Sequence, residues 1–157
     1  TALDADSVMA KSLNFTWKRE VPVLYIVAEL DSILPLEGMQ DMFNRNPEPK
    51  TTVVLLNADH FHFNDAIEQT HDGYKLMLGM LTEGMDEDAR SSTEKMIAGM
   101  KPSSELVAGA DAYALINGLG LAHFDRELRG SQEAVSFLSG DLVARLAEHH
   151  INVKLLF

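Results

Sequence analysis

Two titratable side chains follow two short apolar runs of the sequence. Asp31 comes shortly after the run 21–28, and His60 comes shortly after the run 52–56. A serine hydroxyl is a weak nucleophile at neutral pH, so it needs an adjacent base. That base needs an anion to fix its tautomer and to stabilise the imidazolium. The sequence therefore predicts that Asp31 is the acid and His60 the base of a nucleophilic hydrolase.

The nucleophile of such a site would be a serine in a G-x-S-x-G turn, which presents the hydroxyl on a sharp bend between strand and helix. The 157 residues contain no such turn, and the chain begins at Thr1 rather than at a methionine. We therefore expect a processed or cut product that supplies the acid and the base. The nucleophile and the oxyanion-hole donors would lie in a missing N-terminal half of the same fold, so we expect the chain alone to be inactive.

The elements that must place Asp31 and His60 are a strand, a helix and a second strand. Residues 21–28 are apolar on both faces, as in strands that helices cover on either side. Residues 36–45 carry an apolar stripe of helical spacing, and the second strand is 52–56. Short connections make this a βαβ unit with parallel strands and a right-handed crossover. The carboxyl ends of both strands then share one edge, where ligands bind in open α/β sheets.

The remainder of the chain is predicted to be mostly helical. Helices are expected at 6–15, 65–81, 86–100, 103–130, 131–138 and 141–149, and residues 151–157 are either a closing strand or an extended tail. Ser103 or Ser104 would cap the longest helix, and Gly130 would end it. Because a sheet of two or three mainly parallel strands leaves an open apolar edge, the missing half or a second copy of the chain should cover it.

Composition limits the classes of partner. The chain is 46% hydrophobic and 24% charged, which is typical of a soluble globular domain, and its net charge is −11. This excess of acidic residues argues against nucleic acid or an anionic membrane as a partner. The absence of cysteine excludes a disulfide framework, a zinc–thiolate site and a cysteine nucleophile. No apolar run reaches the ~20 residues that span a bilayer, and we slightly favour the cytoplasm as the compartment.

A metal site is the main chemical alternative. His60 and His62 are alternate residues, so on an extended segment both imidazoles would face the same way and could share an ion. With Asp65 they resemble the H-x-H-x-D-H motif of metallo-β-lactamase-type hydrolases, although the aspartate stands one residue too late and no histidine follows it. Further ligands would have to come from Asp59, His71 or Asp72. A metal-dependent hydrolase is therefore the weaker hypothesis, and His62 is otherwise expected to line or support the site.

Three segments resemble the α/β-hydrolase superfamily. Residues 28–35 read A-E-L-D-S-I-L-P, which is similar to the G-E-x-D-x-x-x-P pattern after the acid strand of that superfamily. Residues 57–65 read N-A-D-H-F-H-F-N-D and resemble the G-A-x-H-x-x-F-x-D histidine loop of dienelactone-hydrolase-like and platelet-activating-factor-acetylhydrolase-like members. Residues 122–130 look like the end of the final helix in the same families.

This resemblance implies an α/β fold, namely the C-terminal part of an α/β-hydrolase domain. It implies a serine hydrolase that cleaves a carboxylic ester, thioester or lactone of a small molecule through an acyl-enzyme, without a cofactor, with Asp31 and His60 as catalytic acid and base. Residues 66–102 are longer and richer in methionine than the usual connection in these families, so we expect a helical insertion or a lid. A hypothesis from a different functional class is that the chain belongs to a non-catalytic pseudo-hydrolase or assembly module, which keeps the fold but lacks the serine.

Overall fold

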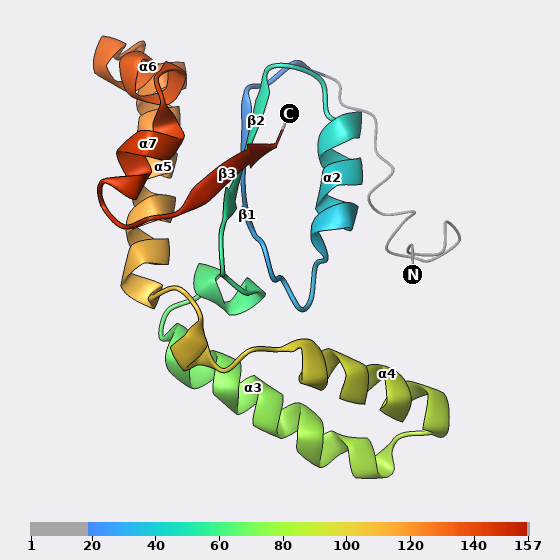
Figure 1. The fold of residues 1–157 in the computed structure, drawn as a ribbon. Coiled ribbons are helices and arrows are strands. Elements are labelled where there is room, and N and C mark those ends of the chain that lie inside the picture. Colours follow the sequence, from blue (N-terminus) through green and yellow to red (C-terminus); the bar gives the residue numbers. More distant parts are fainter. Residues whose placement is uncertain (1–18, 157) are drawn as a thin grey trace.

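The computed structural model describes residues 19–156, in which helices flank a three-stranded sheet (Figure 1). The helix predicted at 6–15 lies outside the described residues. In chain order the main elements are β1 (Val23–Ala28), α2 (Leu36–Arg45), β2 (Lys50–Leu55), α3 (Ile67–Leu81), α4 (Glu87–Gly99), α5 (Gly109–Arg129), α6 (Gln132–Ser139), α7 (Leu142–Ala147) and β3 (Val153–Leu156). Short 3₁₀ turns lie at η1 (His60–Phe63), η2 (Thr82–Gly84) and η3 (Ser103–Glu105). The expected α/β class is confirmed.

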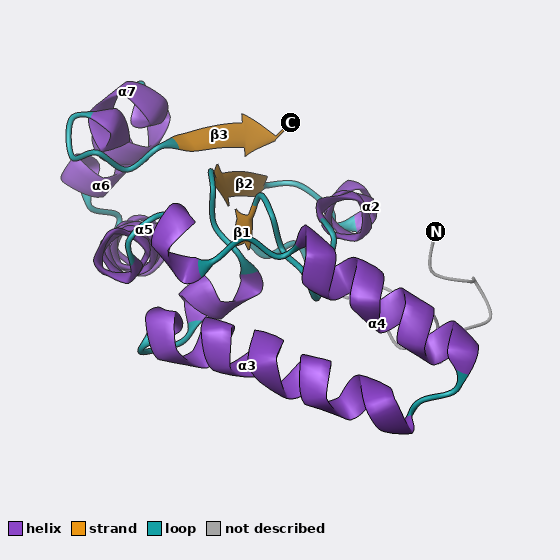
Figure 2. Cartoon of the chain, turned by 60° about the horizontal axis from the view of Figure 1, so that its bottom comes forward, coloured by secondary structure: helices purple, strands orange, loops and turns teal. Residues whose placement is uncertain are grey.

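The predicted βαβ unit is present. Strands β1 and β2 pair in parallel, with Val23 opposite Lys50 and Ala28 opposite Leu55. This register brings the carboxyl ends of both strands to the same level, so the loops that follow them begin side by side. Helix α2 occupies 36–45, as its apolar stripe predicts, and it lies on the opposite side of the sheet from α5 (Figures 1 and 2).

The closing strand is also present, but it runs antiparallel to its neighbour. The strand order is β1-β2-β3, and Val153 of β3 pairs with Leu55 at the end of β2. The expectation of mainly parallel strands is thus wrong in part, because the sheet has one parallel and one antiparallel pair. The reason is the short turn after α7, which delivers the chain beside the end of β2 and bonds the Leu56 N–H to the Asn152 carbonyl at 3.0 Å.

The hydrophobic core lies between the sheet and the C-terminal helices. Three residues of β2, Val53 to Leu55, are completely buried, as expected for the central strand. Helix α5 presents Ala112, Leu115 and Leu119 to this core at helical spacing. The rest of the cluster comes from β1, the β2–η1 turn, α7, the connection after α7 and β3: Ala28, Ala58, Leu142, Leu146, Ile151 and Val153. This packing holds β2, and with it the histidine loop, against the body of the molecule.

The longest helix begins later than predicted. Ser103 does not cap it, because its N–H and hydroxyl both donate to the Asp72 carboxylate, at 3.1 and 2.6 Å. The chain is then extended near Val107, whose N–H bonds to the Asn57 carbonyl at 3.0 Å. Helix α5 therefore starts only at Gly109, whereas its end at Gly130, with φ 62°, is as predicted.

Residues 66–102 are mostly helical, as their sequence predicts. They form α3 and α4, two helices that lie beyond the carboxyl ends of β1 and β2 (Figures 1 and 2). Helix α3 continues without a break, and Asp86 caps α4 through the Ala89 N–H at 2.9 Å. Several apolar side chains of α3, such as Leu76 and Met80, are exposed. A role as a lid stays a prediction. Among residues 19–156, no helix is both long and apolar enough to cross a bilayer.

Candidate acid–base site

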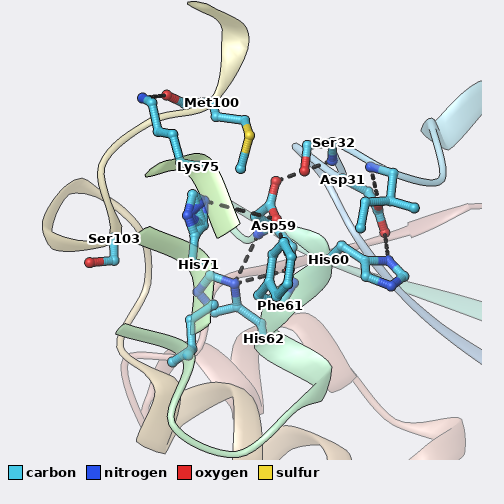
Figure 3. A network of polar contacts seen from close by, with 12 residues as sticks. Asp31, Ser32, Asp59, His60, Phe61, His62, His71, Lys75, Met100 and Ser103 are labelled. Carbon is cyan, nitrogen blue, oxygen red and sulfur yellow. Dashed lines mark hydrogen bonds and ion pairs between the residues drawn. The ribbon is translucent and has the colours of Figure 1, made fainter. Parts of the chain in front are cut away.

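The acid and the base predicted from the sequence are in contact. Nδ1 of His60 lies 3.0 Å from Oδ2 of Asp31 at the shared edge of β1 and β2 (Figure 3). The Asp31 side chain is 7% exposed and the His60 side chain 29% exposed. The carboxylate is thus largely shielded from water, while part of the imidazole remains accessible. The parallel register predicted this proximity, and the catalytic role of the pair stays a prediction.

Backbone amides orient the Asp31 carboxylate. Its Oδ1 accepts the N–H of Ile33 at 2.9 Å and the N–H of Leu34 at 2.6 Å, which is the usual behaviour of an aspartate at the start of a turn. Its other oxygen, Oδ2, is left to face His60. Since the loop itself holds the carboxylate, Asp31 can fix the orientation of the imidazole and stabilise a positive charge on it.

The contact with Asp31 also defines the tautomer of His60. A carboxylate accepts hydrogen bonds, so the proton of a neutral His60 is placed on Nδ1. Nε2 then carries the free lone pair, and within residues 19–156 it has no hydrogen-bond partner. His60 begins the 3₁₀ turn η1, which follows β2 closely. An imidazole held in this way can accept a proton from a hydroxyl at Nε2.

Both ring nitrogens of His62 bind the backbone around the turn η1. Its Nδ1 accepts the Asp59 N–H at 2.9 Å, and its Nε2 donates to the Val107 carbonyl at 2.9 Å. The side chain is buried, and both ring nitrogens are engaged by the backbone. His62 therefore has no lone pair available for an ion shared with His60. In the part of the chain that the structure describes, no group of three or more potential ligand side chains could hold a metal ion. The geometry does not favour the metal alternative.

Asp59 is a site residue whose role the sequence does not predict, because the sequence suggests it only as a further ligand of a metal site. Its side chain is almost completely buried, and its Oδ2 accepts the Ser32 N–H at 3.1 Å. Its Oδ1 accepts the Phe61 N–H at 3.4 Å, which caps η1. The available signal was an aspartate at the start of a turn, which is typical of a cap. No local sequence pattern predicts the hydrogen bond to Ser32, because the two residues are 27 positions apart in the chain.

His71 of α3 lies behind Asp59. It is completely buried, and neither ring nitrogen has a hydrogen-bond partner among the described residues. Its Nε2 is 3.9 Å from Oδ1 of Asp59, and its Nδ1 is 3.8 Å from Oδ1 of Asp72. The ring meets Phe61 edge-on, with 5.7 Å between centroids. Helix α3 thus places a completely buried imidazole beside the Asp59 carboxylate.

Glu29 joins the ends of the three strands. Its Oε2 accepts the Asn57 N–H at 3.0 Å, and its Oε1 pairs with the Lys154 ammonium at 3.0 Å. The backbone hydrogen bond from Asn57 and then the bond from Lys154 hold the pKa of the Glu29 carboxyl below its ordinary value. Asn57 adopts a left-handed conformation with φ 54° between β2 and the histidine loop. Glu29 therefore stabilises the turn that leads to His60.

Comparison of the chain with protein-family models, with curated proteins and with solved structures gave no match. The resemblance to α/β hydrolases thus rests on the sequence patterns described above. The mixed sheet, the Asp31–His60 contact and the buried groups behind it are properties of the structure itself.

Proposed function

We propose that this chain carries the acid and the base of a serine hydrolase of the α/β-hydrolase type, which acts on a carboxylic ester, thioester or lactone. The observation that carries the proposal is the 3.0 Å contact between Asp31 and Nδ1 of His60, while Nε2 has no hydrogen-bond partner among residues 19–156. The order of the two residues in the chain and their position at the carboxyl edge of a parallel strand pair support it.

The reaction follows from the roles of the two side chains. His60 takes the proton of a serine hydroxyl at Nε2 while the oxygen attacks the acyl carbon, and Asp31 stabilises the resulting imidazolium. His60 then returns the proton to the leaving alcohol or thiol, which completes the acyl-enzyme. In the second half, His60 takes a proton from a water molecule that attacks the acyl carbon. His60 then returns this proton to the departing serine oxygen, and the carboxylic acid is released.

The serine comes from outside these 157 residues, because the sequence holds no G-x-S-x-G turn. It is supplied by a longer form of the protein or by a partner chain, together with the N–H donors that bind the oxyanion. This requirement separates an acyl-transfer enzyme from a pseudo-hydrolase, which would share the fold and lack the reactive serine.

The test is labelling of the full-length protein with a fluorophosphonate probe, which reacts with activated serines. We expect one serine to be labelled, and we expect His60→Ala to abolish the labelling. His149→Ala is the matched control, because His149 is exposed on the surface, outside the site. The proposal would be overturned if the full-length protein neither reacts with the probe nor hydrolyses p-nitrophenyl esters. The pseudo-hydrolase would then be the remaining hypothesis. Labelling that survives His60→Ala would overturn the assignment of the base.

A further inference from the structure

One carboxylate links the two loops that carry the acid and the base. Asp59 accepts the N–H of Ser32, the residue directly after Asp31, at 3.1 Å. Its other oxygen accepts the N–H of Phe61, the residue directly after His60, at 3.4 Å. The two amides belong to the β1–α2 loop and to η1, so the Asp59 side chain bridges both segments at the positions next to the reacting pair (Figure 3).

The chemistry of the bridge requires a carboxylate. Two backbone N–H groups need two acceptor oxygens, and an ionised aspartate supplies both. An asparagine supplies one oxygen and presents an NH₂ group to the second donor. Asp59 is also held from its own backbone, because its N–H donates to Nδ1 of the buried His62 at 2.9 Å. The bridge is therefore attached to η1 and not only in contact with it.

Burial makes the bridge rigid. Asp59 is 2% exposed, and His71 behind it is 0% exposed, with its Nε2 3.9 Å from Oδ1 of Asp59. Hydrogen bonds to a charged group are stronger than neutral ones, and low exposure to water strengthens them further. Water therefore has little access to the Asp59 carboxylate itself, while Ser32 and Phe61, which donate to it, are partly buried.

We propose that Asp59 is a positioning residue that sets the distance between Asp31 and His60. This inference rests on the proposed function for its catalytic consequence, although the bridge itself can be tested without any reaction. Asp59 does not touch the reacting atoms. It acts by preventing the β1–α2 loop, which carries Asp31, and the turn η1, which carries His60, from moving apart. A misplacement of about 1 Å between two catalytic groups can lower a rate by about 100-fold.

The first experiment follows the His60–Asp31 hydrogen bond by NMR in the 157-residue chain. The Nδ1 proton of His60 should give a downfield resonance, assigned by its loss in His60→Ala. We expect Asp59→Asn to shift and broaden this resonance and Asp59→Ala to remove it. Asp86→Asn is the matched control, because Asp86 is also a capping aspartate but serves α4. If Asp59→Ala fails to fold, Asp59→Asn decides the result.

The outcomes of this experiment are distinct. A resonance that is unchanged in Asp59→Asn and in a folded Asp59→Ala would overturn the proposal. An equal change in Asp86→Asn would also overturn it, because general destabilisation would then explain the effect.

The second experiment measures hydrolysis by the full-length protein. We expect kcat to fall about 10-fold in Asp59→Asn and about 100-fold in Asp59→Ala, with KM nearly unchanged, since positioning of the base affects the chemical step. Equal activity of Asp59→Ala and wild type would refute the positioning role. If the wild-type protein hydrolyses nothing while the resonance still responds to Asp59, the proposed function fails and the bridge between the loops stands.

Discussion

Oδ2 of Asp31 and Nδ1 of His60 are 3.0 Å apart, although 29 positions separate the two residues in the chain. The contact follows from the equal register of β1 and β2, which end opposite one another at Ala28 and Leu55. Each strand is followed by a short segment that turns its titratable side chain toward the other. The pair is thus a product of strand pairing, and the loops set its final geometry.

The first prediction concerns catalysis by the pair. In the full-length protein, we expect Asp31→Asn or His60→Ala to lower kcat by about 10⁴-fold or more, because loss of the acid leaves the imidazole in the wrong tautomer and loss of the base leaves the hydroxyl unactivated. Steady-state hydrolysis of an activated ester measures the change. Asp65→Asn is a control at an exposed carboxylate of the same loop. A loss smaller than about tenfold for either variant would contradict the assignment.

The second prediction concerns the pH dependence of stability through Glu29. Its folded-state pKa is lowered by the Asn57 N–H and by Lys154, so the ionised form contributes stability above the unfolded pKa, near 4.5, and this contribution is lost as the pH falls through the folded pKa. Glu29→Gln should therefore unfold more easily than wild type at neutral pH, and the difference should shrink below pH 4.5. Urea unfolding across this range measures it.

A partner variant separates the two causes of this effect. Lys154→Met removes the ion pair and leaves the backbone hydrogen bond from Asn57, so it should lose only part of the stability that Glu29→Gln loses. If the difference in free energy of unfolding between wild type and Glu29→Gln stays constant down to the most acidic pH, the ionised Glu29 carboxylate is not the source of the stability.

The third prediction concerns an unpaired hydroxyl in the central strand. Thr52 is 3% exposed, and its Oγ1 has no hydrogen-bond partner among the described residues. Valine has the same shape and suits a strand, so Thr52→Val should raise the free energy of unfolding by up to about 1 kcal/mol. Thr51→Val is the control, because Thr51 is only partly buried. Destabilisation by Thr52→Val in urea titrations would show that the hydroxyl is satisfied.

The fourth prediction compares a glycine within the longest helix with the glycine that ends it. A methyl group added at Gly118 or Gly130 meets no atom within 4 Å, so only the backbone conformation distinguishes the two positions. Gly118→Ala should stabilise the chain by roughly 0.5–1 kcal/mol, because alanine is the better helix residue. Gly130 is left-handed, with φ 62°, so Gly130→Ala should destabilise it by about 1 kcal/mol. Thermal unfolding should show a higher Tm than wild type for Gly118→Ala and a lower Tm for Gly130→Ala.

The local features of this protein could be predicted from the sequence alone. The apolar run at 21–28, the stripe at 36–45 and the second apolar run determine the βαβ unit, and the unit determines that Asp31 and His60 meet. Gly130 ends the last long helix for a similarly local reason, since glycine adopts the left-handed conformation most easily. These features depend on residues near one another in the chain or on the regular geometry of paired strands.

The tertiary structure decided what depends on distant partners. Helix α5 starts at Gly109 rather than at the predicted residue 103, because Asp72 and Asn57 form hydrogen bonds with the segment before it. The direction of β3 depends on where α7 ends, and no periodicity in 151–157 encodes this. Asp59 joins the acid loop only because Ser32, 27 positions away, is folded against it. Hydrogen bonds of this kind have no sequence period, so they become visible only when the chain is packed.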